Sequence, residues 1–281
     1  MLSILITGAA RGIGHELVQR ALARGDLVFA TVRKPADAER FPATQNLKVI
    51  LMDVADSASV EQGFAEIDRL LQGRQLDAVI NAAAISLPGA LELAPISEFE
   101  QTLNTNAVGS ARIARAAIPR LRGHGGRLIF VTSLWGRAAG GLLASYCASK
   151  HAIEAIADVA RRETAGMNLH VVVCQPGVVM TKMLTGQAAD IEALLAKMTP
   201  AQKDVYGVYY QRYAKLTSSA TGSAITTAKA AENIERALFA KRPRTRYQFG
   251  IDSKLVCFLA WLLPDRWMDA MMNASLNRKP L

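Results

Sequence analysis

The sequence contains little cysteine, no long apolar run and no tract rich in Pro, Gly or Ser. Its three cysteines are too few and too scattered among 281 residues for a disulfide framework or a metal ligand set, so we expect buried thiols, a reducing compartment and no metal. The longest unbroken apolar run, Leu255 to Leu263, falls well short of the roughly 18 residues that predict a membrane span. Because Met1 leads almost directly into an apolar stretch without the charged region of a secretory signal, we expect a soluble, cytoplasmic protein.

Charge is the property of the composition that departs most from average. The chain has 33 Lys and Arg residues against 24 Asp and Glu, a formal charge of +9, while hydrophobic residues make up 51%. The hydrophobic share excludes a disordered chain. The basic surplus is compatible with nucleic acid, an acidic membrane or a phosphate-bearing cofactor, so the motifs have to decide among them.

Short apolar runs alternate with longer helical patterns along most of the chain. Continuously apolar strands that alternate with helices indicate a parallel sheet covered on both faces, and right-handed crossovers favour a doubly wound α/β sandwich. The predicted strands are Leu2 to Ile6, Leu27 to Val32, Leu47 to Met52, Asp77 to Ile80, Arg127 to Thr132, Leu169 to Cys174 and Arg246 to Phe249.

The alternation breaks after Pro176-Gly177, in a segment that is helical but irregular. Ligands bind beyond the carboxyl ends of the strands in an open α/β sheet, so this insertion, about 178–228, is predicted to be a substrate lid. No linker divides the chain. We expect one α/β domain over 1–250, which includes the lid, and an apolar and basic C-terminal extension over 251–281 packed on the same domain.

A glycine-rich turn follows the first predicted strand. It reads Thr7-Gly8-Ala9-Ala10-Arg11-Gly12-Ile13-Gly14 and leads into a helical pattern. Glycine lets the backbone turn sharply and approach a pyrophosphate, and a helix N-terminus offers unpaired N–H groups and a partial positive charge. The turn predicts a dinucleotide site, with a glycine turn that binds nothing as the alternative. Its expected cofactor-binding residues are Gly8, Arg11, Gly12, Ile13 and Gly14.

The end of the second predicted strand bears on which dinucleotide is bound. A fold that prefers NAD normally places a carboxylate there to hold the ribose 2′-hydroxyl, but this strand ends in Val32-Arg33-Lys34. Arg33 could pair with a 2′-phosphate, and Arg11 could approach the same phosphate, so NADP(H) is favoured over NAD(H). The alternative is that Arg33 is a solvated charge. Asp53, after the third strand, is expected near the adenine ring or as a turn residue.

Tyr146 and Lys150 are four residues apart in a helical stretch, so both project from one face. An ammonium near a phenol lowers the pKa of the tyrosine from about 10 towards neutrality, and such a tyrosine can exchange a proton with an alcohol oxygen. Ser133 lies thirteen residues earlier, at the carboxyl end of a predicted strand, where its hydroxyl can bind the same oxygen.

Together these motifs resemble the short-chain dehydrogenase/reductase family over nearly the whole chain. They occur in family order and at family spacing. The residues that carry the resemblance are Thr7-Gly8-x-x-x-Gly12-Ile13-Gly14, Asp53-Val54, Asn81-Ala82-Ala83-Ala84, Asn106 with Gly109, Ser133, Tyr146 with Lys150, and Pro176-Gly177 followed by Thr181. The Ala30-Thr31-Val32-Arg33 segment, the long lid and a Leu-Leu-Pro-Asp tail are similar to the NADP-preferring branch that includes hydroxysteroid and retinol dehydrogenases.

The resemblance implies a seven-stranded parallel Rossmann sheet and a catalytic tetrad of Asn106, Ser133, Tyr146 and Lys150. Tyr146 would be the general acid or base, Ser133 would polarise the substrate oxygen, and Asn106 would anchor a proton-relaying water. Lys150 would hold the nicotinamide ribose and lower the tyrosine pKa. Further cofactor contacts implied by the family are Val54, Asn81, Ala83, Tyr146, Lys150, Pro176, Gly177, Val179 and Thr181. The family also implies a homodimer or homotetramer through the helices near Asn106 and Tyr146.

One departure concerns the fourth motif, where the family usually has Asn-Asn-Ala-Gly and this chain has Asn81-Ala82-Ala83-Ala84. Ala84 in place of glycine could narrow the space beside the nicotinamide ribose or force a φ that alanine disfavours. Because Asn81 and Ala83 are retained, we expect the change to be tolerated.

The C-terminal extension is both basic and apolar. Residues 241–281 hold eight Lys and Arg against three Asp, five of the surplus of nine. We expect a core-covering helix or a dimer contact; a lid over a hydrophobic pocket and an amphipathic helix, over 255–272, on an acidic bilayer are less favoured alternatives.

These observations predict an NADP(H)-dependent oxidoreductase that moves hydride between nicotinamide C4 and a ketone or secondary alcohol. The substrate is expected to be small and hydrophobic. A cofactor-sensing protein without turnover is the alternative on the same fold. A nucleic-acid binder is suggested by the charge alone, since the chain has no nucleic-acid-binding motif.

Overall fold

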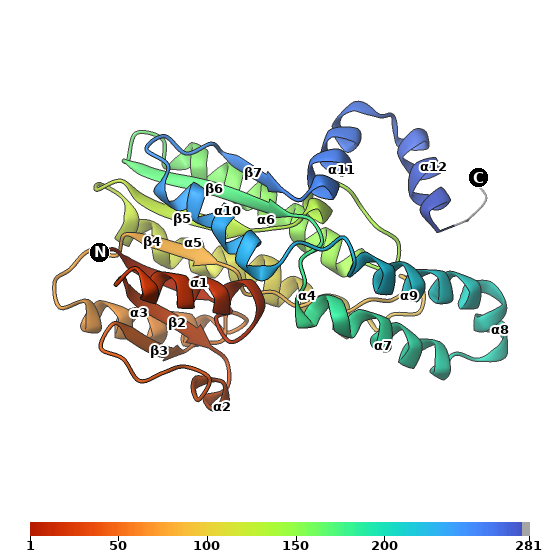
Figure 1. Ribbon diagram of the computed structural model, residues 1–281, viewed down its shortest axis with the longest axis horizontal. Helices are drawn as coiled ribbons and strands as arrows, with labels where there is room; N and C mark the ends of the chain where they lie inside the picture. The colour runs from red at the N-terminus through yellow and green to blue at the C-terminus, as the bar shows by residue number, and fades with distance from the viewer. Residues whose placement is uncertain (277–281) are drawn as a thin grey trace.

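A computed structural model describes residues 1–276, in which seven parallel strands form one sheet between two layers of helices (Figure 1). The strand order is β3-β2-β1-β4-β5-β6-β7. The predicted doubly wound fold is confirmed, and no strand end differs from its predicted position by more than two residues. The strands are β1 (Ser3–Thr7), β2 (Leu27–Val32), β3 (Leu47–Leu51), β4 (Ala78–Asn81), β5 (Gly126–Val131), β6 (Leu169–Pro176) and β7 (Arg246–Phe249).

The helices follow the strands as right-handed crossovers require. Helix α3 begins after Asp56, whose carboxylate accepts a 2.9 Å hydrogen bond from the Ala58 N–H, and α1 ends near Gly25, which has a φ of 82°. The helices are α1 (Gly12–Ala23), α2 (Pro35–Ala38), α3 (Ser57–Leu71), α4 (Ile96–Leu103), α5 (Gly109–Leu121), α6 (Ala144–Glu163), α7 (Lys182–Lys197), α8 (Pro200–Gln202), α9 (Val208–Ala220), α10 (Thr227–Phe239), α11 (Ile251–Leu262) and α12 (Asp265–Ser275).

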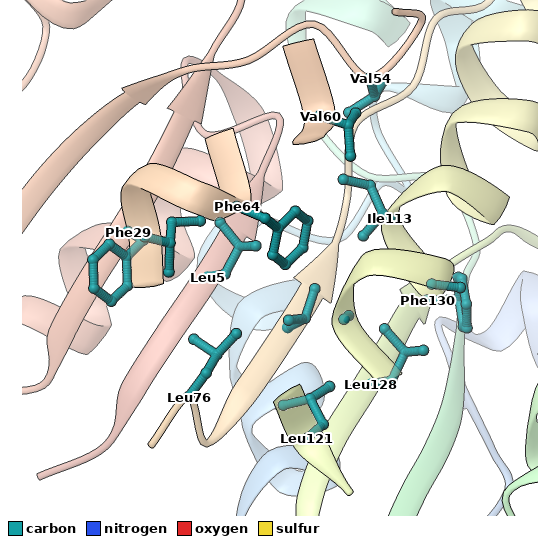
Figure 2. Close-up of a cluster of buried hydrophobic side chains, with 14 of the residues drawn as sticks. Leu5, Phe29, Val54, Val60, Phe64, Leu76, Ile113, Leu121, Leu128 and Phe130 are labelled. Carbon is teal, nitrogen blue, oxygen red and sulfur yellow. The ribbon is translucent and has the colours of Figure 1, made fainter. Parts of the chain in front are cut away.

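Each face of the sheet has its own apolar core. Because side chains alternate along a strand, Leu5 of β1 belongs to the core under α3, α5 and α6, while Ile4 and Ile6 belong to the core under α1 and α10. Figure 2 shows the first core, in which Phe29 and Phe64 lie beside Leu5. Burying a side chain of this size stabilises the fold by about 1.5–3 kcal/mol. The sheet is therefore a rigid support for the loops at its edge.

The segment predicted as a lid contains two packed helices, α7 and α9, which extend away from the sheet (Figure 1). Its base is closed by backbone hydrogen bonds from Met180 N–H to the Ile225 carbonyl, 2.9 Å, and from Ile225 N–H to the Val178 carbonyl, 3.0 Å. At the inner side of α9, the buried hydroxyl of Tyr210 accepts a 2.7 Å hydrogen bond from the Ala90 N–H. These contacts hold α9 against the loop after β4.

The C-terminal extension forms helices α11 and α12. The inner face of α11 buries Ser253 and Cys257, while its outer face exposes large apolar side chains at helical spacing: Ile251, Leu255, Phe258 and Leu262. Residues 251–276 carry two basic and three acidic side chains, so the basic surplus of the tail lies mainly before α11. Residues 277–281 of the predicted extension lie outside the described residues. In the described part of the chain, no helix has the length and apolar character that crossing a membrane requires.

Candidate active site

The candidate site lies at the carboxyl ends of β1, β4, β5 and β6, where an open α/β sheet binds its ligands. The glycine turn follows β1, and its glycines are required by space as well as by conformation. Gly8 has a φ of 67°, and a Cβ added to it would lie 2.7 Å from the Ala83 Cα. A Cβ on Gly14 would overlap the Gly8 carbonyl oxygen. This narrow turn at the start of α1 forms the backbone cradle that a pyrophosphate needs, so the predicted residues fit a dinucleotide.

The loop after β6 closes the other side of this cradle. A Cβ on Gly12, whose φ is 58°, would lie 3.3 Å from Thr181 Cγ2, so Thr181 lies directly over the glycine turn. Thr181 also caps α7 by accepting a 3.4 Å hydrogen bond from the Leu184 N–H. Val179 is buried at the base of the lid. The structure thus brings Gly8, Gly12, Gly14, Ala83 and Thr181 together, as the sequence predicted.

A hydrogen-bond chain connects the cofactor turn to the helix that carries Asn106. Thr7 Oγ1 accepts from the N–H groups of Ala82 and Ala83, at 3.0 and 3.1 Å, and donates 2.8 Å to Asn81 Oδ1. Asn81 Nδ2 donates 2.7 Å to Ser110 Oγ, which donates 2.6 Å to the Asn106 carbonyl. The roles of Thr7 and Ser110 are visible only in the structure, because their partners are distant in the sequence.

Asn106 lies in a π-helical turn, Asn104–Val108, between α4 and α5. Such turns insert an extra residue and are frequent at functional sites. Asn106 is fully buried, accepts 2.9 Å from the Ile85 N–H, and donates 2.8 Å to the Ile85 carbonyl and 3.0 Å to Ser149 Oγ. Its amide therefore fixes the loop after β4 against α6. Whether it also anchors a water stays a prediction.

Ser133, Tyr146 and Lys150 come together between β5 and α6, as predicted. Lys150 Nζ lies 5.4 Å from the centre of the Tyr146 ring and donates a 3.0 Å hydrogen bond to the Val131 carbonyl. Ser133 is buried and hydrogen-bonded to the Tyr146 side chain, while its Oγ accepts 3.2 Å from the Trp135 N–H. The arrangement places a hydroxyl, a phenol and an ammonium at one point of the sheet edge.

The pKa of Tyr146 departs from the prediction. Its half-buried side chain packs against the apolar cluster between α6 and the lid, and the resulting desolvation raises its pKa to about 12, although the hydrogen bond with Ser133 acts in the opposite direction. The decrease expected from Lys150 does not offset this burial, and the ammonium donates its hydrogen bond to the Val131 carbonyl. Burial lowers the pKa of Lys150 to about 8, and the charge of Glu154 opposes that decrease.

Glu154, one helical turn after Lys150, is a second feature that the sequence did not reveal. Its carboxylate is 5% exposed. Oε1 accepts 2.7 Å from Thr132 Oγ1 and 2.9 Å from Gln175 Nε2, and Oε2 accepts 2.9 Å from Arg246 Nε. A buried carboxylate needs such partners. A single charge thus joins the carboxyl ends of β5 and β6 to the start of β7, behind Tyr146 and Lys150.

The residues predicted to choose the cofactor lie at the surface beyond β2. Arg33 is exposed and makes no ion pair with the described residues, which leaves its charge available to a ligand. The exposed Arg11 lies 3.9 Å from an oxygen of Asp37, and Ile13 follows it in the first turn of α1. Asp53 acts as a turn residue, since its Oδ1 accepts 2.9 Å from the Ala55 N–H. Its contact with adenine stays a prediction.

The departure at Ala84 causes no backbone strain. Among the described residues, a positive φ outside glycine occurs at Gln72, Leu142 and Asn168, and Ala84 is not one of them.

Val54 packs against Gly109, where an added Cβ would lie 3.0 Å from the Val54 carbonyl oxygen. The described residues contain no group of three or more His, Cys, Asp or Glu side chains able to hold a metal ion.

Comparison with known proteins bears on the family of the chain. The human protein "Retinol dehydrogenase 5" is 30% identical over 98% of this chain and 89% of its own length. The "NADPH-dependent 3-dehydrocapnine reductase" of Ornithobacterium rhinotracheale is 26% identical over 98% and 97%. A crystal structure of a short chain dehydrogenase from Burkholderia cenocepacia in complex with NADP matches with a TM-score of 0.73 at 22% identity, over 99% of this chain and 98% of that one.

The family model for short chain dehydrogenase matches residues 3–192, from the first strand through the glycine turn and the Ser133, Tyr146 and Lys150 cluster into the lid. With the strand order and the site geometry, this match shows that the chain belongs to the short-chain dehydrogenase/reductase family of NAD(P)-dependent oxidoreductases, which interconvert alcohols and carbonyl compounds.

Proposed function

We propose that the protein is an NADP(H)-dependent oxidoreductase that transfers hydride between the cofactor and a hydrophobic ketone or secondary alcohol, with Tyr146 as the group that exchanges the proton. The observation that carries the proposal is the convergence of Ser133, Tyr146 and Lys150 beside the glycine turn. A protein that only sensed the cofactor would need no proton donor there.

The protonation state of Tyr146 favours carbonyl reduction. With a pKa raised to about 12, the phenol keeps its proton at neutral pH and can donate it to a carbonyl oxygen. Ser133 supplies a hydroxyl that can hold the same oxygen, while the cofactor, when bound, supplies the hydride. Lys150, with a pKa of about 8, is mostly charged at neutral pH and stabilises negative charge that develops on the phenol.

The choice of NADP(H) rests on Arg33. Its exposed guanidinium is free to form charge-assisted hydrogen bonds with a 2′-phosphate, and no carboxylate ends β2. The names of two similar proteins point the same way, because the Ornithobacterium reductase is NADPH-dependent and the Burkholderia structure holds NADP. Gly8, Gly12, Gly14 and Thr181 would hold the pyrophosphate.

The hydrophobic character of the substrate follows from the surroundings of Tyr146. A third apolar cluster lies between the catalytic helix and the lid, and Tyr146 packs at its margin. The human relative is named a retinol dehydrogenase, and retinol is also a hydrophobic alcohol. The buried members of this cluster include Leu142, Leu143, Cys147 and Tyr213, and Trp135 and Tyr209 pack against them.

The proposal is tested by assaying the purified protein with a panel of hydrophobic ketones and alcohols, using NADPH and NADH separately. We expect NADPH oxidation with at least one ketone, and a higher kcat/KM for NADPH than for NADH. Binding of NADPH without turnover of any panel member would favour the sensing role instead. Turnover with NADH alone would overturn the cofactor assignment.

A further inference from the structure

Helix α11, in the C-terminal extension, touches two loops of the candidate active site. It packs against β7 and against the short turn Leu134–Gly136, which follows Ser133. Its first turn also reaches the loop after β6, residues 177–181, which lies over the glycine turn through Thr181. The extension is therefore in direct contact with backbone that the proposed function assigns to the cofactor.

Asp252, in the first turn of α11, holds the middle of that loop. Its Oδ2 accepts a 2.6 Å hydrogen bond from the Val178 N–H. Its Oδ1 fills the space where a side chain at Gly177 would lie, and a Cβ on Gly250 would overlap the same oxygen. The Asp252 carboxylate therefore occupies space that a side chain at Gly177 or Gly250 would need. Gly250 also has a φ of 97°, which residues other than glycine rarely adopt.

Ser253 holds the strand just before the loop. It is fully buried, and its Oγ donates a 2.8 Å hydrogen bond to the Gln175 carbonyl. Between the two side-chain contacts, the Gly177 N–H donates 2.9 Å to the Phe249 carbonyl of β7. Residues 175, 177 and 178 are therefore tied, one after another, to the segment 249–253.

We propose that Asp252 and Ser253 are positioning residues, which fix the loop after β6 and so set the affinity of the protein for NADP(H). The inference rests on the proposed function, because that function assigns the loop, through Thr181, to the pyrophosphate of the cofactor. On this reading the C-terminal extension is an integral part of the cofactor site. The outer face of α11, which is apolar and exposed, has no part in this role.

The test compares NADPH binding to the full chain and to Asp252→Ala, by titration of cofactor fluorescence. We expect the dissociation constant to rise about tenfold, the order of effect for losing a hydrogen bond to a charged acceptor. Asp252→Asn keeps an acceptor oxygen and is expected to lie between the two. Ser253→Ala is expected to weaken binding in the same direction, and kcat at saturating NADPH is expected to change less than KM for NADPH.

Hydrogen exchange supplies a readout that does not depend on activity. In Asp252→Ala, the amides of 177–181 should exchange faster, while those of β1 and β4 keep their wild-type rates. Asp265→Ala is the matched control, because it removes the acidic residue in the first turn of α12 and changes the net charge equally. It should bind NADPH like the wild type.

Two outcomes would overturn the inference: Asp252→Ala binding NADPH within twofold of wild type, or faster exchange spread evenly over the whole sheet. The latter would indicate general destabilisation. If instead the wild-type protein bound neither NADPH nor NADH, the proposed function itself would fail, and this result is separate from any difference between variants.

Discussion

Arg246 Nε donates a 2.9 Å hydrogen bond to Oε2 of Glu154, and the same guanidinium lies 3.0 Å from Asp158. The pair links the edge strand β7 to the helix of Tyr146 and Lys150. The ionisable groups near Glu154 include Lys150 and Asp158 on its own helix, Arg246 from β7 and Cys257 from α11. Glu154 is thus the acidic group whose charge acts on Lys150, one helical turn away.

Replacing Glu154 with Gln is expected to move the basic limb of the pH profile to lower pH. Carbonyl reduction requires charged Lys150, whose pKa is about 8, so activity should fall as pH rises through that value. Glu154 raises that pKa, and removing its charge lowers it, so the charged form is lost earlier. The measurement is kcat/KM with NADPH between about pH 6 and 9.5. The control is Glu163→Gln, which changes an exposed residue at the end of the same helix. If the basic limb of the pH profile lay at the same pH in both variants, the proposed influence of Glu154 on Lys150 would be refuted.

Tyr146→Phe is expected to reduce kcat by a factor of about 10² or more, because it keeps the ring and removes the proton donor. NADPH affinity should remain within a few-fold of wild type, which separates a chemical defect from a binding defect. Tyr247→Phe, which removes a hydroxyl that accepts 3.1 Å from the Arg244 N–H away from the site, serves as the comparison. Turnover of Tyr146→Phe within tenfold of wild type would contradict the mechanism.

Arg33→Ala should raise KM for NADPH by about tenfold or more and leave KM for NADH nearly unchanged, since a charge-assisted hydrogen bond contributes about 1.5–3 kcal/mol. The ratio of the two kcat/KM values measures the effect. Arg122→Ala removes an exposed arginine between α5 and β5, at the amino ends of the strands and away from Arg33, and should not change that ratio. An unchanged ratio in Arg33→Ala would leave Arg33 as a solvated charge.

Gly14→Ala and Gly186→Ala form a matched pair within helices. At Gly14 a Cβ would overlap the Gly8 carbonyl oxygen, so we expect NADPH binding weakened by more than tenfold and a lower melting temperature. At Gly186, in α7, the nearest atom is 4.0 Å away, and alanine should raise the free energy of unfolding by about 0.5–1 kcal/mol. Calorimetry and cofactor titration distinguish the two. Similar behaviour of both variants would show that close packing of the turn is unimportant.

Much of the fold follows from the sequence, because buried parallel strands are continuous apolar runs and their ends are set by the first polar or glycine residue. The proximity of Tyr146 and Lys150 follows for a similar reason, because both lie on one helix four residues apart. The carboxyl end of β6 extends past the predicted Cys174, since Gln175 and Pro176 join the strand by pairing with β7.

Features that depend on the three-dimensional surroundings of a residue could not be predicted from the sequence. The pKa of Tyr146 depends on how far the phenol is removed from water, and sequence spacing does not report that quantity. Glu154 and Asp252 appear in the sequence as ordinary helix carboxylates, and their importance comes from strands up to 92 residues distant. The helical pattern of the extension predicted a core-covering helix or a dimer contact, and it did not show that most of the large apolar side chains of α11 face outward.

The chain of hydrogen bonds from the glycine turn to Asn106 has a direction. Each member accepts on one side and donates on the other, from the Ala83 N–H through Thr7, Asn81 and Ser110 to the Asn106 carbonyl. Asn81 must therefore present an acceptor and a donor at fixed positions, a polarity that aspartate of the same shape does not have. Aligned dipoles in such a chain strengthen one another. The glycine turn and the π-helical turn that carries Asn106 are thus joined by hydrogen bonds that all run in one direction, and the amide at position 81 supplies both the acceptor and the donor that this chain needs.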